Sequence, residues 1–374
     1  YNMHRALCSV FKAPALQATC SARVASRGLA TRPVIRTAYV PADGIGPEVC
    51  FATRTILDKL GAPVEWVPVQ AGFELFSKTG STFEDNALDT IRNCHAVLFG
   101  AVSSPSHKVD GYFSPILHLR KEFDLYANVR PVMSTPSLPG SVPDVDIVIL
   151  RENTECLYIK KESLYEGPDG KRAEAIRLIT EKASKRIARK AMQIASARNK
   201  NQAPKVTIVH KANVLSVSDG LFRESCLEVA KDFPNVHVEE QLVDSCVYRL
   251  FINPQSFDVI VCPNLYGDIL SDAAAALVGG LGLVSSANVG DKLMLVEPVH
   301  GSAPDIAGKG IANPIATLRA AAMMLEHFGH PELARRIEGG IQQAIKDAVL
   351  TRDMGGSATT KEITQAILAS AQRL

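Results

Sequence analysis

Short apolar runs alternate with helical segments along the chain, and this alternation limits the folds that the chain can adopt. Strand-like runs occupy residues 34–40, 64–69 and 96–100, and a helical segment at 86–93 separates the last two. Strands that alternate with helices indicate a doubly wound α/β protein. The 374 residues suffice for one large or two moderate domains.

A glycine-rich turn follows the first of these runs. Residues 42–48 combine Gly44 and Gly46 with Pro47, which suits the first turn of a helix. The turn does not match the G-x-G-x-x-G fingerprint, which occurs nowhere else in the chain. The sequence therefore predicts an α/β fold other than a classical Rossmann fold.

Charge and hydropathy argue against two classes of function. The 41 basic and 39 acidic residues leave a net charge of +2, so the composition gives no support for nucleic-acid binding. No apolar stretch approaches the roughly 20 residues that span a bilayer, so no membrane partner is expected. The eight cysteines are scattered without a C-x-x-C pair. They are predicted to be buried free thiols and not disulfides or zinc ligands.

The first 42 residues differ from the rest of the chain. They contain arginine, lysine, serine and threonine, and the first acidic residue is Asp43. This composition is typical of a mitochondrial transit peptide, and a disordered basic tail is the alternative. We expect residues 1–33 to be a transit peptide and the folded protein to lie in the mitochondrial matrix.

Two aspartates follow a buried strand in residues 257–272. The apolar run 257–262 ends at Pro263, and Asp268 and Asp272 stand four apart near a predicted helix start. This spacing places both carboxylates on one helix face, where like charges repel unless a cation lies between them. Hard oxygen ligands suit Mg²⁺ or Mn²⁺. The alternative is ordinary, because acidic residues favour the first turn of any helix.

Several longer segments resemble one enzyme family. Residues 263–272 (PNLYGDILSD), 151–158 (RENTECLY), 210–213 (HKAN) and 297–308 (EPVHGSAPDIAG) resemble motifs of the β-hydroxyacid oxidative decarboxylases, which comprise isocitrate, isopropylmalate and homoisocitrate dehydrogenases. The likeness runs from about Thr37 to the C-terminus. At Ala42 this family normally has glycine.

The resemblance implies a two-domain fold with a mixed sheet. Residues 34–131 with 280–374 would form the large cofactor-binding domain. Residues 132–279 would form a small domain with the dimer interface. The turn residues 167–170 predict a hairpin at about 158–178, and in this family such an arm interlocks two subunits. The active unit would be a homodimer or tetramer with shared active sites.

The resemblance also implies roles for individual residues. Tyr158 and Lys211 would be catalytic, although a tyrosine in a strand is more often a packed aromatic. Asp244, donated with Lys211 by the partner, would join Asp268 and Asp272 as a metal ligand. The substrate residues would be Ser104, Ser114, Arg120, Arg130, Arg151, Tyr158, Lys211 and Asn213, the arginines gripping carboxylates. NAD would contact Val102, Ser103, Ser104, Asn213, Glu297, His300, Gly301, Ser302, Ala303, Pro304, Asp305, Ile306 and Asn313.

The substrate is less constrained than the reaction. Residues 99–112, 157–160 and 244–251 look most like homoisocitrate dehydrogenases of fungal mitochondria. This likeness implies NAD-dependent oxidative decarboxylation of the tricarboxylate homoisocitrate to 2-oxoadipate and CO₂ in lysine biosynthesis. The alternatives are an NAD-isocitrate dehydrogenase, as a catalytic or regulatory subunit, and a 3-isopropylmalate dehydrogenase. Ile116 is aliphatic, and some bacterial relatives have arginine at Leu117, so side activities stay open.

Overall fold

The computed structural model describes residues 34–374 except 106, 108 and 199–201. The predicted transit peptide, residues 1–33, lies outside the described residues. Six cysteines in the described part are buried free thiols, as the sequence predicted: Cys50, Cys94, Cys156, Cys226, Cys246 and Cys262. No helix within the described ranges is long and apolar enough to cross a membrane.

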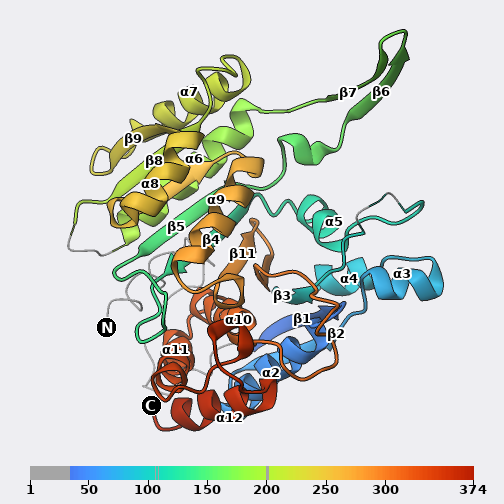
Figure 1. Cartoon of the computed structure of the whole chain (residues 1–374), viewed down its shortest axis with the longest axis vertical. Coiled ribbons are helices and arrows are strands. Elements are labelled where there is room, and N and C mark those ends of the chain that lie inside the picture. The colour runs from blue at the N-terminus through green and yellow to red at the C-terminus, as the bar shows by residue number, and fades with distance from the viewer. Residues whose placement is uncertain (1–33, 106, 108, 199–201) are drawn as a thin grey trace, which may run out of the picture.

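A ten-stranded mixed sheet runs through the molecule (Figure 1), with the strand order β2-β1-β3-β12-β11-β4-β5-β10-β8-β9. Strand β4 pairs antiparallel with β5 and β11, and β11 pairs antiparallel with β12, while the other neighbours are parallel. The strands are β1 (Ile35–Ala42), β2 (Val64–Pro68), β3 (Ala96–Ala101), β4 (Ala127–Met133), β5 (Asp146–Glu152), β8 (Lys205–His210), β9 (His237–Leu242), β10 (Val259–Cys262), β11 (Ser285–Val289) and β12 (Met294–Pro298). The predicted α/β fold with a mixed sheet is confirmed.

Helices cover both faces of this sheet. The helices are α2 (Gly46–Lys59), α3 (Phe73–Thr79), α4 (Ala87–Arg92), α5 (Pro115–Glu122), α6 (Glu181–Ala197), α7 (Ser218–Ala230), α8 (Val243–Ile252), α9 (Asn264–Leu277), α10 (Ile315–His327), α11 (Pro331–Lys346) and α12 (Thr360–Ala371). Alternate residues of β5 separate the two faces. Val148 and Leu150 join the core under α2, α6, α7, α10, α11 and α12, whereas Ile147 and Ile149 join the core under α8 and α9.

The order of strands in the sheet follows the predicted division of the chain. Strands from residues 35–133 and 285–298 form one side of the sheet, and strands from residues 146–262 form the other. The chain crosses between β4 and β5 through the Pro/Gly/Ser-rich residues 136–143. Because the sheet itself is continuous across this crossing, the two-domain division stays a prediction.

A hairpin extends away from the body of the protein (Figure 1). Strands β6 (Glu162–Gly167) and β7 (Gly170–Ala175) pair antiparallel, and every residue in them is exposed. The predicted hairpin within residues 158–178 is therefore confirmed. Because an isolated two-stranded hairpin is marginally stable in water, this arm lacks the packing that would support it within one chain.

Ala42, at the end of β1, has the backbone conformation of a glycine. Its φ is +58°, in the left-handed region that costs an L-residue about 1–2 kcal/mol. We expect Ala42→Gly to stabilise the fold by about 1 kcal/mol, because relief of this strain exceeds the added chain entropy. Urea unfolding should show a higher midpoint. The matched variant Ala52→Gly, within α2, should lower it, and a lower midpoint for both would contradict the strain.

Candidate active site

A cavity of about 270 Å³ lies at the ends of β3 and β12, beside α5 and α9. Ten of the predicted site residues line it: Val102, Ser104, Arg120, Arg130, Arg151, Tyr158, Asp268, Glu297, His300 and Gly301. Ile116, expected to influence the choice of substrate, also lines the cavity. The fold thus brings together segments separated by nearly two hundred residues of sequence.

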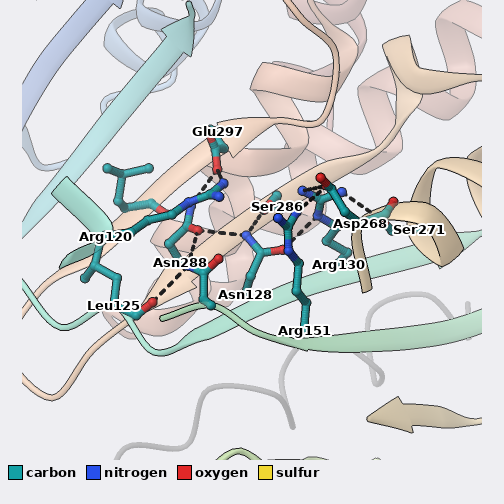
Figure 2. A network of polar contacts seen from close by, with 12 residues as sticks. Arg120, Leu125, Asn128, Arg130, Arg151, Asp268, Ser271, Ser286, Asn288 and Glu297 are labelled. Atoms are coloured by element: carbon teal, nitrogen blue, oxygen red, sulfur yellow. Dashed lines mark hydrogen bonds and ion pairs between the residues drawn. The ribbon is translucent and has the colours of Figure 1, made fainter. Parts of the chain in front are cut away.

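Three arginines reach this cavity from three different elements. Arg120 lies on α5, Arg130 on β4 and Arg151 on β5, and all three are buried. Arg120 Nη2 lies 2.8 Å from Glu297 Oε1, Arg151 pairs with Asp268, and Arg130 lies 3.4 Å from both Asp268 Oδ1 and Asp272 Oδ1 (Figure 2). These carboxylates offset the cost of burying the three guanidinium charges.

The arginines retain capacity for an anionic ligand. Arg120 Nε and Arg151 Nη2 are buried and donate to no group among the described residues. Burial, with the like charge of Arg151, lowers the pKa of Arg130 to about 10, so Arg130 remains charged at neutral pH. Buried donors without partners are costly. A ligand with several carboxylates would satisfy them.

The helix with the two aspartates starts earlier than the sequence indicated. The sequence places the helix start near Asp268, but α9 begins at Asn264, directly after Pro263. The aspartates therefore do not lie in the first turn, where they would serve only the helix dipole. Gly267 explains the close approach of α9 to β5, because a Cβ there would lie 2.5 Å from the Cβ of Arg151. This contact holds Asp268 against the arginines.

The two carboxylates differ in their surroundings. Burial acts to raise the pKa of Asp268, but Arg151, Arg130 and a hydrogen bond from Tyr158 hold it below its ordinary value. For Asp272, burial and the charge of Asp268 raise the pKa. An added cation would relieve this repulsion, so the pair fits a divalent ion. Within the described ranges no group of three or more His, Cys, Asp or Glu residues could hold a metal.

Tyr158 lies over the arginines on a short 3₁₀ turn, Leu157–Ile159. Its hydroxyl donates a hydrogen bond to Asp268 Oδ2, and its ring lies 4.9 Å from the Arg151 guanidinium carbon. Burial raises the pKa of Tyr158, which keeps the hydroxyl protonated. The side chain is therefore placed as a proton donor at the cavity wall.

Lys211 and Asp244 lie outside this cavity. Lys211 Nζ pairs with Asp244 Oδ1 at 2.8 Å, and this hydrogen bond lowers the pKa of Asp244. Two residues that the sequence did not single out hold this pair: Asp219 accepts the backbone N–H of Lys211 at 2.6 Å and pairs with Arg177 at 2.7 Å. Asn213 also lies outside the cavity. The Lys211–Asp244 pair therefore lies apart from the arginine-lined cavity of the same chain.

The loop after β12 forms another wall of the cavity. Ser302 Oγ accepts a hydrogen bond from Ser103 Oγ at 3.1 Å, which joins the two predicted cofactor segments. Asp43, another residue that sequence reasoning missed, accepts backbone N–H groups of Phe73, Glu74 and Ser103 at 2.9 Å. The segment 102–104 is thereby fixed beside the loop.

Donors and small residues in this loop suit a dinucleotide. Burial lowers the pKa of His300, and its Nε2 atom is buried without a hydrogen-bond partner in the described structure. Asp305 and Pro304 in this loop are exposed. Ala303 and Ile306 pack on Ile45 and Val49 at the start of α2. The unpaired nitrogen and the exposed carboxylate fit a cofactor with an amide or ribose hydroxyls.

Two predicted residues are engaged in the fold itself. Asn313 donates to Asp353 Oδ2 at 2.9 Å and accepts the N–H of Ile315 at the start of α10. Ser114 precedes the first residue of α5 and lies outside the cavity lining. Their proposed contacts with adenine and with substrate stay predictions.

Comparison with known proteins agrees with this arrangement. The family model described as isocitrate/isopropylmalate dehydrogenase matches residues 36–367. An isocitrate/homoisocitrate dehydrogenase of Thermus thermophilus is 49% identical over 91% of this chain and 99% of its own length. A 3-isopropylmalate dehydrogenase of Archaeoglobus fulgidus is 45% identical over 88% of this chain and 97% of its own.

A solved structure agrees as well. The isocitrate dehydrogenase from Methylococcus capsulatus matches with a TM-score of 0.86 and 42% identity, over 91% of this chain and all of that one. The sequence match over residues 36–367 and the match in fold therefore support the same family. The chain belongs to the isocitrate/isopropylmalate dehydrogenase family.

Proposed function

We propose that this decarboxylating dehydrogenase converts homoisocitrate to 2-oxoadipate and CO₂ with NAD, in the biosynthesis of lysine. The observation that carries the proposal is the convergence of Arg120, Arg130 and Arg151, two of them with unpaired donors, on one cavity beside Tyr158. Three guanidinium groups suit a substrate with three carboxylates. The chain segments quoted above favour homoisocitrate over isocitrate and 3-isopropylmalate.

The relatives are named for different substrates, so the choice among these substrates rests on the residues of the cavity wall. The Thermus relative is named for isocitrate and homoisocitrate, and the Archaeoglobus relative for 3-isopropylmalate. Ile116 gives the wall an aliphatic side chain near Arg120, which would tolerate the extra methylene of homoisocitrate. One methylene is worth only about 1–3 kcal/mol of discrimination. Residual turnover of isocitrate is therefore expected.

Different residues of the chain have different roles in the proposed reaction. The three arginines hold the substrate carboxylates and align the reacting C–H bond. Lys211 of a second subunit takes the proton of the substrate hydroxyl, and Tyr158 donates a proton to the carbon that has lost CO₂. Members of this family use NAD(P) and a divalent metal. When bound, NAD would accept the hydride, and Mg²⁺ or Mn²⁺ would stabilise negative charge on the substrate oxygen.

Asp268 and Asp272 would hold the metal together with Asp244 of a second copy. The side chain of Asp272 is about half exposed and has one long contact with Arg130. We expect Asp272→Asn to raise the Mg²⁺ or Mn²⁺ concentration needed for half-maximal activity by about tenfold or more, because one anionic ligand is lost. Titration of activity with metal measures this. Asp89→Asn, exposed on α4, is the matched control. Full activity of the native enzyme in excess EDTA would contradict the metal site.

The exposed carboxylate of Asp305 should select the cofactor. It would accept hydrogen bonds from the ribose hydroxyls of NAD and repel a 2′-phosphate. We expect kcat/KM for NAD to exceed that for NADP by about a hundredfold, the size of two to three kcal/mol of charge repulsion and lost hydrogen bonds. Initial rates with each cofactor measure the ratio. Equal values for the two cofactors would exclude this role.

The proposed assembly is a homodimer, or a tetramer built from two such dimers. Large apolar side chains are exposed on neighbouring helices: Tyr248, Phe251 and Ile252 on α8 and Ile269 on α9. The hairpin adds exposed Leu164 and Tyr165. Exposed apolar surface of this kind favours an interface. This surface lies on α8 and α9, the helices that carry Asp244 and Asp268. Pairing of two chains through it would bring Lys211 and Asp244 of one chain to the cavity of the other.

The decisive experiment is a substrate panel. The purified chain should oxidise homoisocitrate with a higher kcat/KM than isocitrate, 3-isopropylmalate or tartrate. A higher value for isocitrate or 3-isopropylmalate would replace the proposed substrate. Failure of the chain alone to reduce NAD with any of them would favour a regulatory subunit. The mitochondrial matrix and the fungal type of enzyme stay proposals that rest on the basic leader and on the resemblance.

A further inference from the structure

A chain of buried side chains connects two of the cavity arginines through the middle of the sheet (Figure 2). Arg130 Nε donates to Asn128 Oδ1 at 2.7 Å, and Asn128 Nδ2 donates to Asn288 Oδ1 at 2.8 Å. Asn288 Nδ2 then donates to Glu297 Oε1 at 2.7 Å, and Arg120 Nη2 donates to the same oxygen at 2.8 Å. We call this chain the asparagine relay.

The pairing of strands explains why the relay forms. Asn128 and Arg130 are two apart on β4 and share a face of the sheet, whereas Val129 between them points into the opposite core. Asn288 is the register partner of Asn128 across β4 and β11. Three polar side chains thus lie in one buried row, with both asparagines fully excluded from solvent.

The direction of every hydrogen bond in the relay is fixed. A guanidinium can only donate, so the oxygen of Asn128 must face Arg130 and its NH₂ group must face Asn288. The NH₂ group of Asn288 must in turn face the carboxylate of Glu297. Asn153 Nδ2 adds a second donor to Asn288 Oδ1 at 2.9 Å. Reversal of either amide would place two acceptors or two donors against each other inside the sheet, so the relay has one stable arrangement.

At Arg130 the relay orients a charge without adding an opposite charge. Arg120 and Arg130 carry like charges, and a carboxylate at the position of Asn128 would compensate the charge of Arg130. The neutral oxygen of Asn128 instead holds the guanidinium by one bond and adds no negative charge to those of Asp268 and Asp272, which lie 3.4 Å from Arg130. Asparagine is also disfavoured in central strands, where apolar residues would pack as well.

We propose that Asn128 and Asn288 are positioning residues, which hold Arg130 and the Arg120–Glu297 pair in the arrangement that binds the substrate carboxylates. This inference rests on the proposed function, since it assumes an acid with several carboxylates. It assigns a role to two residues in the sheet behind the cavity, neither of which lines it.

The test compares Asn128→Ser, Asn288→Ser and the double variant in the full chain. The readout is the Kd of homoisocitrate, isocitrate or 3-isopropylmalate measured by calorimetry with Mg²⁺ and without NAD, using whichever acid binds the native protein. Each single change should weaken binding by about tenfold, and the double change by no more, because either one interrupts the relay. For Asn128→Ser, NAD affinity should stay within about twofold, which general destabilisation would not predict. Asn288 holds Glu297, a predicted NAD contact, so NAD affinity is compared in Asn128→Ser alone.

Ser286→Ala is the matched control. Ser286 is also buried on β11 and accepts a hydrogen bond from Asn128 at 2.8 Å, but it lies on a side branch. It should leave the Kd of the acid unchanged. If the serine variants do not fold, the isosteric Asn128→Asp serves alone: its added charge beside Arg130 should weaken binding of the acid by about tenfold with NAD affinity retained.

Three results would overturn the proposal. One is unchanged binding of the acid in the single variants, and another is a loss in the double variant that equals the product of the two single losses. The third is an equal loss of acid and NAD affinity in Asn128→Ser. Each would assign the asparagines to stability alone. If the native protein bound none of the three acids, the positioning role of Asn128 and Asn288 would also be excluded. If the native protein binds an acid but does not oxidise it, the proposed reaction fails and the relay does not.

Discussion

Replacement of Lys211 by methionine is expected to lower kcat by roughly a thousandfold, the usual contribution of a general base. Methionine keeps the length of the side chain and removes the ammonium group that contacts Asp244 at 2.8 Å. The variant should also fail to reduce a supplied β-keto acid intermediate, because that reverse hydride transfer needs a proton at the same oxygen. Steady-state rates with the acid and with the keto acid measure both effects.

A second lysine provides the control for this prediction. Lys205 is the first residue of β8, the strand that Lys211 directly follows, and it pairs with Glu239 at 3.4 Å, away from the arginine-lined cavity. Lys205→Met should therefore retain kcat while losing some stability. If Lys211→Met kept more than about a tenth of native kcat, its role as a base would be excluded.

Where a local pattern decided the structure, the sequence predicted it. The hairpin follows from turn residues between extended segments. At the start of α12, Thr359 and Glu362 form a capping box, which their spacing in the sequence favours. At the start of α6, Thr180 is the N-cap and its side chain accepts the N–H of Ala183. Each of these features depends on residues that are close in the chain.

Strands β11 and β12 were not predicted, although residues 293–296 of the second form an apolar run. Ser285, Ser286 and Asn288 are fully or nearly fully buried, so β11 lacks the apolar run that marks an internal strand. The reason became visible only in the sheet, where Asn288 faces Asn128 across the register. A buried polar pair of this kind cannot be inferred from one strand alone.

The candidate site was predicted in part for the same reason. The resemblance pointed to Arg120, Arg130 and Arg151, and the structure places all three at one cavity. Asp43 and Asp219 were missed, because their partners lie 30 to 60 and 8 residues away and no periodicity marks them. They act by holding backbone N–H groups of the segments that present Ser103 and Lys211, a role that becomes apparent from tertiary geometry.

The separation of Lys211 and Asp244 from the cavity leads to the second large effect. Within one chain, Tyr158 lines the cavity and Lys211 does not. If each site takes Tyr158 from one subunit and Lys211 from the other, a hybrid of Tyr158→Phe and Lys211→Met chains contains one site with both defects and one site with neither. Each variant alone should be nearly inactive.

Mixing equal amounts of the two variants should restore activity to about a quarter of the native value. Random exchange makes about half of the dimers hybrids, and one site of each hybrid is intact. Subunit exchange must be verified, for example by mass spectrometry of tagged chains, before the rates are compared. A mixture of Tyr158→Phe with Tyr158→Arg chains, which share the damaged position, is the control and should stay inactive. Complete exchange without recovered turnover would mean that each chain builds its whole site, and Asp244 would then be excluded as a ligand donated across the interface.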